Sequence, residues 1–375
     1  MDWKLIESDQ ALVDLLESAR GSDVVIVDTE FMRRNTFFPQ VALVQLCFSG
    51  GGADGTAWLI DPLCIDDPEP LARLLEDPAV TKVLHSASED LEVFQSWLGV
   101  LPRPLFDTQK AAALAGMEFG MGYRALVLAL CEEDLPKGET RSDWLQRPLT
   151  ESQCHYAAQD VSWLLSVYRL LEQRLRELGR IDWVLEDGDD ATRSLATATP
   201  DYYRRIKNAW KLSSRQLAVL IAVCSWREET ARIKNKPRSW IIDDKACLQL
   251  ALEQPLSFQQ LRSEVELPPQ ALRRYGDSLV EIVDHQQGLG ERELPPRLPP
   301  PLSAAQRKQL KALKGRAAQI AADLDVPPQI LVASKDFETL MRIAGGEDAR
   351  EPEYWSGWRQ ERVIGPLKAS MGQAA

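Results

Sequence analysis

The stretch VVIVDTEF, residues 24–31, determines the fold that the sequence predicts for the first part of this chain. Its β-branched residues favour a strand at residues 24–28, and two carboxylates, Asp28 and Glu30, follow the apolar run. Side chains two residues apart lie on the same face of an extended chain, so both carboxylates point to the same side. The pair by itself is a weak signal, because acidic residues also occur where a strand ends in solvent.

Around this stretch, short β-rich runs alternate with helical patterns over the first 180 residues, as is typical of an α/β domain. Further strands are predicted at residues 41–48, 57–61 and 82–85. Because the glycine-rich residues 49–56 predict a hairpin loop, part of the sheet is antiparallel and the sheet is mixed. Helices are predicted at residues 68–75, 91–98, 108–115, 123–131 and 151–178.

The pattern changes after this domain. Residues 186–200 are acidic and predict a loop, and strand signals nearly vanish from residue 202 onward, which predicts an all-α region. Prolines in residues 291–302 predict an extended linker. We therefore expect three domains, at residues 1–195, 203–290 and 303–375.

Composition limits the functional classes. The 375 residues are 45% hydrophobic and 27% charged, which is enough apolar material for packed cores. Six scattered cysteines argue against a disulfide framework, and only three histidines exclude a multi-histidine metal site. No signal peptide and no run of 18 apolar residues is found, so we expect a cytoplasmic protein without a membrane partner. The net charge of −12 divides into −17 for residues 1–200 and +5 for residues 201–375, so the second part is expected to contact nucleic acid.

Further carboxylates complete a possible metal site. Asp90 follows the strand at residues 82–85, where an acidic helix start is the ordinary explanation. Tyr156 and Asp160 are one helical turn apart and share a face, and an aspartate on a partly buried helix needs a partner. Four carboxylates and a phenol suit two-metal phosphodiester hydrolysis, in which Mg²⁺ or Mn²⁺ takes oxygen ligands and the tyrosine orients water.

Three segments resemble the motifs of the DEDD exonuclease superfamily, in its tyrosine-bearing branch. They are VDTEF at residues 27–31, HSASEDL at residues 85–91 and YAAQDV at residues 156–161. The chain is also similar to the bacterial ribonuclease D family in FFPQVALVQL at residues 37–46, FDT at 106–108, SDW at 142–144 and RPL at 147–149. The resemblance implies an α/β ribonuclease H-like exonuclease domain with a mixed sheet.

The resemblance also implies roles for the site residues. Two divalent ions, Mg²⁺ or Mn²⁺, are expected to bind to four carboxylates, those of Asp28, Glu30, Asp90 and Asp160. Tyr156 is expected to position the nucleophilic water. We interpret His85 as a packing residue, with a phosphate contact as the alternative, and Asp107 as a helix cap rather than a fifth ligand. No organic cofactor is expected.

The second domain resembles the helicase-and-RNase-D C-terminal (HRDC) domain, a helical bundle that often binds nucleic acid. The matching residues include Trp226, Arg227, Glu228 and Ala231. The third domain is a more divergent match, so we expect two all-α HRDC-type domains. Basic residues are candidate RNA contacts, with a solvated surface as the alternative: Lys137, Arg141, Arg147, Arg204, Arg205, Lys207, Lys211, Arg232 and Lys234.

These expectations give a functional hypothesis. The resemblance implies a 3′–5′ exoribonuclease that trims structured RNAs such as tRNA precursors with a single-stranded 3′ end and releases nucleoside 5′-monophosphates. A DNA-directed 3′–5′ exonuclease in repair is the main alternative, and a non-catalytic RNA-binding adaptor is the third. A monomer is expected.

Overall fold

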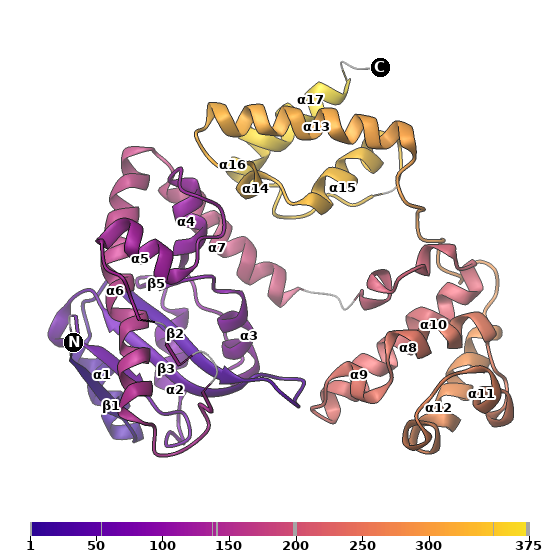
Figure 1. Ribbon diagram of the computed structural model, residues 1–375, viewed down its shortest axis with the longest axis horizontal. Helices are drawn as coiled ribbons and strands as arrows, with labels where there is room; N and C mark the ends of the chain where they lie inside the picture. The colour runs from indigo at the N-terminus through magenta and orange to yellow at the C-terminus, as the bar shows by residue number, and fades with distance from the viewer. Residues whose placement is uncertain are drawn as a thin grey trace. The chain divides into compact units, whose positions relative to one another are not determined.

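The computed structural model describes residues 2–53, 55–136, 138–139, 142–197, 201–347 and 349–372. Its contacts divide the chain into two units (Figure 1). Unit 1 consists of residues 1–32, 39–197 and 303–375, and unit 2 consists of residues 33–38 and 198–302. Residues 303–375 therefore pack with the first predicted domain and do not form a separate unit.

Unit 1 is built on a six-stranded mixed sheet, as the sequence predicted. Its strands are β1 (Trp3–Ile6), β2 (Val24–Met32), β3 (Gln40–Phe48), β4 (Ala57–Ile60), β5 (Thr81–Leu84) and β6 (Leu105–Asp107), in the order β1-β4-β3-β2-β5-β6. Strand β3 is antiparallel to β2 and β4, whereas the other three pairings are parallel. Strands β1 and β6 were not predicted, because runs of four and three residues are too short to show an alternating pattern.

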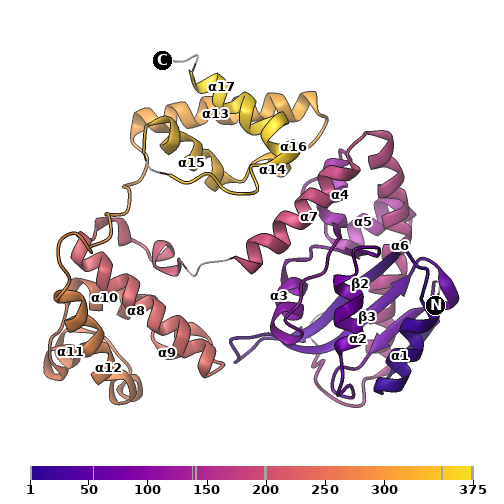
Figure 2. The ribbon, with the colours of Figure 1, turned by 180° about the vertical axis from the view of Figure 1, so that it is seen from behind.

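The two faces of the sheet bury different side chains of β2. Val24 and Ile26 contact a core that contains side chains of α6 (Glu151–Glu177). Val25 and Val27 contact a core that contains side chains of α1 (Asp9–Ser18), α2 (Glu69–Glu76) and α3 (Ser88–Trp97). Figure 1 shows α6 across one face, and Figure 2 shows α1, α2 and α3 on the other. Because strand side chains alternate, Asp28 and Glu30 face α6.

All five helices predicted in the first domain are present. The longest, α6, begins at a capping box in which Gln153 N donates to Thr150 Oγ1 (3.2 Å) and Thr150 N donates to Gln153 Oε1 (3.0 Å). The other helices of this region are α4 (Thr108–Leu114) and α5 (Tyr123–Cys131). None of the helices within the described residues is long and apolar enough to span a membrane.

The loop predicted at residues 186–200 was wrong for residues 186–196, because Ile181–Ala196 forms helix α7. Residues 198–200 of that prediction lie outside the described residues. Although the sequence of α7 is acidic, one face of the helix is buried. Asp187 is only 3% exposed and receives two hydrogen bonds from the Arg359 guanidinium, at 2.6 and 2.9 Å, and one from Trp358 Nε1 at 3.1 Å. The partners that make this helix possible lie more than 170 residues further along the chain, so a local pattern does not reveal them.

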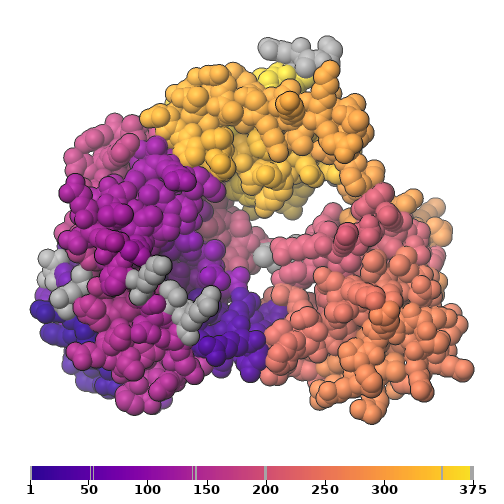
Figure 3. All heavy atoms as spheres, in the orientation of Figure 1, coloured from indigo at the N-terminus to yellow at the C-terminus, as the bar shows by residue number. Residues whose placement is uncertain are grey.

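The C-terminal part of unit 1 completes its core. Its helices are α13 (Ala304–Asp323), α14 (Pro328–Leu331), α15 (Ser334–Ala344), α16 (Gly357–Arg359) and α17 (Gly365–Gly372), with a π-helical turn at Gln360–Ile364. In Figure 3 their side chains, in orange and yellow, fill the spaces between these helices. The Trp358 ring stacks on Trp183 of α7 with a centroid distance of 4.6 Å. Leu313, Phe337 and Ile364 belong to the same buried cluster as α6 residues such as Val161.

Unit 2 is all-helical, as predicted. Two short 3₁₀ turns, Tyr202–Arg205 and Ala209–Lys211, precede α8 (Ser214–Ile233), α9 (Arg238–Ile241), α10 (Asp244–Glu253), α11 (Phe258–Glu264) and α12 (Pro269–Gln287). Leu217, Leu220, Cys247, Leu250 and Leu279 lie in its core. This cluster is separate from the cores around the sheet, so unit 2 has its own hydrophobic core.

Helices α8, α9 and α10 have counterparts in α13, α14 and α15. The first helix of each series has 20 residues and begins at a Ser-x-x-Gln capping box, at Ser213 and at Ser303. A left-handed residue follows each of these helices, Asn235 with φ 46° and Asp325 with φ 51°. A proline then caps a four-residue helix in both cases. The C-terminal region of unit 1 therefore repeats the start of unit 2 at the level of helix lengths and caps.

Candidate active site

Three carboxylates converge between the sheet and α6. The ligand oxygens of Asp28 and Glu30 on β2 and of Asp160 on α6 all lie within 4.8 Å of one another. Because side chains alternate along β2, Asp28 and Glu30 lie on the face that α6 covers, and Asp160 lies on the side of α6 that packs against that face. The structure therefore brings together three of the four predicted ligands, although 130 residues separate Glu30 from Asp160.

Asp90, the fourth predicted ligand, lies on the other side of β2 from these three carboxylates. It is buried in the first turn of α3, and its Oδ1 accepts a hydrogen bond from Thr29 Oγ1 at 2.5 Å. Because Thr29 lies between Asp28 and Glu30 on the opposite face of the strand, this bond holds Asp90 on the α3 side. Asp90 lies outside the group of three, but its charge contributes to the raised pKa of Asp28.

Burial and mutual repulsion favour the protonated forms of these acids. Burial, together with the charges of Asp90, Asp160 and Glu30, raises the pKa of Asp28 well above its ordinary value. Burial and the charges of Asp160 and Asp90 raise the pKa of Glu30 to about 9, and burial raises the pKa values of Asp90 and Asp160 to about 7. Such a cluster needs a positive counter-charge to be fully ionised.

The donor set is suited to a divalent cation. Asp28, Glu30, Asp90 and Asp160 offer only carboxylate oxygens, the ligands that Mg²⁺ and Mn²⁺ prefer. A bound cation also supplies the missing counter-charge. The residues present therefore fit a hard divalent metal.

Tyr156 lies one turn before Asp160 on α6 and shares a hydrogen bond with it. Burial and the neighbouring carboxylates raise the pKa of its phenol, so the hydroxyl stays protonated at neutral pH. The Trp144 ring lies near the Tyr156 ring, with a centroid distance of 6.1 Å. The backbone of Gly138 approaches the same ring so closely that a Cβ there would lie 1.7 Å from Tyr156 Cε2. Both neighbours restrict where the phenol can lie.

The carboxylates open into a hollow of about 460 Å³ that several unpredicted residues line. Tyr123 on α5 donates from its hydroxyl to the Gln159 carbonyl at 2.7 Å, and Arg124 forms an ion pair with Asp134 at 2.6 Å. Gly138 also lines this hollow. These residues belong to no motif that was recognised, and no local signal in the sequence connects them to Asp28 or Asp160.

His85 and Asp107 lie beside this site. His85 lines the hollow, and its Nδ1 is 3.0 Å from Thr108 Oγ1, while burial lowers the pKa of its imidazole. Its packing role and the alternative phosphate contact both stay predictions. Asp107 accepts hydrogen bonds from Gln109 N (2.9 Å) at the start of α4 and from Ser86 N (3.1 Å), which confirms that it is a cap.

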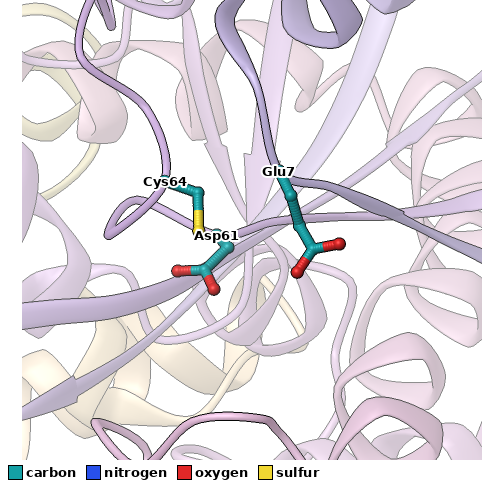
Figure 4. A group of neighbouring side chains, drawn as sticks. All are labelled: Glu7, Asp61 and Cys64. Carbon is teal, nitrogen blue, oxygen red and sulfur yellow. The ribbon is translucent and has the colours of Figure 1, made fainter.

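A second cluster of ligand-type side chains consists of Glu7, Asp61 and Cys64 (Figure 4). Both oxygens of Asp61 already accept hydrogen bonds from the Arg147 guanidinium, at 2.5 and 2.7 Å. Asp61 is only 1% exposed, so this ion pair neutralises a buried charge. The cluster therefore has its counter-charge from the protein itself.

The same bonds argue against the predicted RNA contact of Arg147. Its remaining N–H groups donate to the carbonyls of Ala42 (2.6 Å), Trp144 (2.8 Å) and Gln146 (2.9 Å). All five donors of the guanidinium are used within the protein, so none is left for a phosphate. Arg147 instead ties the segment before α6 to β3 and β4. Two further predicted contacts, Lys137 and Arg141, lie outside the described residues.

The other predicted RNA contacts lie in unit 2, and several already have partners. Arg204 forms an ion pair with Asp201 at 3.0 Å, and Lys211 Nζ lies 5.5 Å from the centre of the Trp210 ring. Arg232 forms an ion pair with buried Glu228 at 2.9 Å. Lys207 and Lys234 are exposed. The predicted residues therefore do not form one uniform basic surface.

Arginines and aromatic rings alternate in one stack within unit 2. The Arg232 guanidinium lies 4.8 Å from the Phe37 ring, Arg238 lies 4.6 Å from the same ring and 3.9 Å from Tyr202, and Arg205 lies 5.4 Å from Tyr202. Glu228 accepts hydrogen bonds from both Arg232 and Arg238. In this stack Arg232 and Arg238 hold Phe37 against α8 and α9, and Arg205 packs on Tyr202.

Comparisons with known proteins agree with this geometry. Residues 3–176 match the family model described as 3′-5′ exonuclease, and residues 216–283 match the HRDC domain model. The chain is 42% identical over 361 residues to the ribonuclease D of Pseudomonas paraeruginosa, covering 96% of this chain and 94% of that protein. It is 36% identical over 372 residues to the ribonuclease D of Escherichia coli, covering 98% of each. A crystal structure of Escherichia coli RNase D, described as an exoribonuclease involved in structured RNA processing, superposes with a TM-score of 0.91 at 34% identity, covering 100% of this chain and 99% of that one.

Proposed function

Because the chain belongs to the ribonuclease D family, we propose that it trims the 3′ ends of structured RNAs, tRNA precursors among them, with two divalent metal ions. It is a 3′–5′ exoribonuclease, a hydrolase of phosphodiester bonds, and its exonuclease family uses divalent metals. The substrate is RNA, so we do not propose DNA repair or a non-catalytic adaptor function as its main role. Structured substrates are proposed because the Escherichia coli relative is described as processing them.

The observation that carries the metal proposal is the group of carboxylate oxygens of Asp28, Glu30 and Asp160 within 4.8 Å. Together with Asp90 these residues are proposed to hold two ions, Mg²⁺ or Mn²⁺. Bound there, such ions supply activation of water and stabilisation of the leaving oxygen. Their positive charge also offsets the repulsion that raises the pKa of Asp28.

Tyr156 is proposed to orient the nucleophilic water. Its hydroxyl stays protonated, so it can accept from a water and donate to an oxygen at the same time. Its place beside Asp160 puts it at the edge of the carboxylate group. Hydrolysis then leaves a 3′ hydroxyl on the shortened RNA and releases a nucleoside 5′-monophosphate.

Unit 2 and the C-terminal helices are proposed to bind the body of the RNA. We propose that Lys207, Lys211 and Lys234 contribute to this binding, with Arg204 as an exposed neighbour. Residues 303–375 are proposed to be a second HRDC-type domain, supported by the shared helix lengths and capping boxes of α8 and α13. A cytoplasmic location belongs to the same proposal, because RNA precursors are present in the cytoplasm. A monomeric state is proposed as well.

The experiment that tests this function combines metal binding with product analysis. Asp28→Asn and Asp160→Asn are expected to weaken Mn²⁺ binding in calorimetry and to abolish the stepwise shortening of a 5′-labelled RNA with a single-stranded 3′ tail. Asp189→Asn, an exposed carboxylate on α7, is the matched control and should behave as wild type. Near-normal activity of either site variant would contradict the metal assignment. A DNA oligonucleotide of the same sequence, degraded equally fast, would contradict the preference for RNA.

A further inference from the structure

A second hollow, with a volume of about 310 Å³, lies in unit 2 between the segment that follows α8 and the start of α12. The residues that matter for its chemistry are Lys234, Lys236, Trp240, Asp243, Arg274 and Tyr275. Three of these are cations and two are aromatic. The hollow therefore combines positive charge with flat apolar surface in one place.

The three cations of the hollow have no acidic partner. Three acids of unit 2 pair with other cations: Glu228 pairs with Arg232 and Arg238, Asp244 pairs with Arg227, and Glu266 pairs with Lys245. Within the described residues 201–302, none of the ion pairs includes Lys234, Lys236 or Arg274. The one carboxylate in the lining, Asp243, accepts from Ala246 N at 2.8 Å as the cap of α10. The hollow is left with a net positive charge.

The aromatic residues lie beside these cations. Trp240 is 60% exposed, which is unusual for so large an apolar side chain. Lys236 Nζ lies 5.6 Å from the centre of the Trp240 ring, and Lys234 Nζ lies 5.7 Å from the centre of the Tyr275 ring. Trp226 packs edge-on against Tyr275 with a centroid distance of 5.3 Å and restricts its movement. A flat ligand can therefore lie on an aromatic ring while its negative charge meets an ammonium group.

The segment that carries the two lysines is held in place. Asn235, between them, adopts a left-handed conformation with φ 46°. Its Oδ1 accepts hydrogen bonds from Phe37 N (2.9 Å) and Phe38 N (3.0 Å). Lys236 Nζ donates to the Asn35 carbonyl at 3.4 Å. Because the turn is anchored, less conformational entropy is lost when the lysines bind a ligand.

We propose that this hollow binds a nucleotide of single-stranded RNA, with the base against Trp240 and the neighbouring phosphates at Lys234, Lys236 and Arg274. Stacking on an exposed aromatic ring combined with cations that track the backbone is how single strands are bound without sequence preference. The inference rests on the proposed function, because it takes the ligand to be RNA. The site that it proposes for the RNA is separate from the carboxylate site. It also moves the expected RNA contact from the stacked Arg205 and Arg232 to this hollow.

An acidic protein segment is the other polyanion that the charge would suit. The nucleotide is favoured because the lining places aromatic rings within 6 Å of two of its ammonium groups, so base and phosphate are recognised together. A peptide carboxylate would use the cations and leave Trp240 unpaired.

The test measures binding of the full-length chain to a 5′-fluorescein-labelled 20-nucleotide oligoadenylate by fluorescence anisotropy, in EDTA so that no hydrolysis occurs. Trp240→Ala is expected to raise the Kd roughly 5- to 150-fold, the loss of one stacked base. Its control is Ile233→Ala, because Ile233 is a 77% exposed residue at the end of α8, next to this segment, but does not line the hollow. Lys236→Ala should weaken binding and reduce the slope of log Kd against log salt by about 0.7. Arg262→Ala, an exposed cation on α11 outside the hollow, should change neither.

Hydrolysis of a trinucleotide with Mg²⁺ separates this inference from the proposed function. Trp240→Ala and Lys236→Ala should release mononucleotides from it at the wild-type rate, and their melting temperatures should match that of the wild type. If both variants bind the 20-nucleotide probe as the wild type does, the inference is overturned and the hollow serves another polyanion. If the wild type itself fails to hydrolyse the trinucleotide, the proposed function fails, whatever the hollow binds.

Discussion

Gly138→Ala is expected to disable Tyr156 without unfolding the protein. A Cβ at residue 138 would lie 1.7 Å from Cε2 and 1.8 Å from Cδ2 of the Tyr156 ring. Carbon atoms in contact are separated by roughly 3.5–4.0 Å, so the ring and the backbone of residue 138 must move apart by about 2 Å. Tyr156 shares a hydrogen bond with Asp160, and a shift of this size moves its hydroxyl away from that partner.

The magnitude follows from the size of the shift. Misplacement of a positioning group by about 1 Å costs on the order of 10²-fold in rate. We therefore expect kcat to fall about 100-fold, which corresponds to about 2.7 kcal/mol, while the KM for RNA changes little. Residue 138 is exposed, so the melting temperature should stay close to that of the wild type.

The assay is steady-state release of mononucleotides from a uniformly labelled RNA, combined with a double-mutant cycle. Tyr156→Phe lacks the hydroxyl, so adding Gly138→Ala to it should cost little more. Gly122→Ala is the control, because a Cβ there meets no atom within 4 Å. Additive losses in the double variant, or a kcat of Gly138→Ala within about twofold of wild type, would refute the reasoning.

Two other predictions concern single side chains. Tyr156→Phe is expected to lower kcat about 100-fold and to leave the Kd for RNA in EDTA unchanged; an equal loss in kcat and affinity would speak against its positioning of water. Asp187→Ala leaves the Arg359 guanidinium, 13% exposed, without its carboxylate, so the free energy of unfolding in urea should fall by about 3–5 kcal/mol. Asp189→Ala, an exposed neighbour on α7, should unfold as the wild type does, and equal stability of all three proteins would argue against the buried ion pair.

The relative positions of the site residues could be predicted from two periodicities, that of a strand and that of a helix. The alternation of a strand puts Asp28 and Glu30 on one face, and the turn of a helix puts Tyr156 beside Asp160. The resemblance to the exonuclease motifs then identified which acidic residues to combine. What these patterns leave open is the distance between β2 and α6, which is set by packing over the sheet. The roles of all five site residues stay predictions until variants are measured.

The errors arose where a side chain has a distant partner. Arg147 was predicted to contact RNA because it is basic and lies on a loop, but its guanidinium donates to Asp61 and to three carbonyls. The acidic residues 186–200 were predicted to form a loop at a domain boundary, but Asp187 lies on a helix and is buried against Arg359. Charge in a sequence does not indicate whether the charge faces water or an ion pair.

The sequence by itself determined the α/β class, the mixed sheet, the helical second part and the motif residues. These features depend on neighbours a few residues apart, whose spacing is visible in the chain. Only the tertiary structure decided that α7 is a helix, that residues 303–375 complete the core of unit 1, and that Gly138 lies against Tyr156. It also decided which cations lack an acidic partner among the described residues, because Lys236 and Arg274 form no ion pair there while Arg147 is bound to Asp61. Each of these depends on contacts between residues far apart in sequence, which form only when the cores pack.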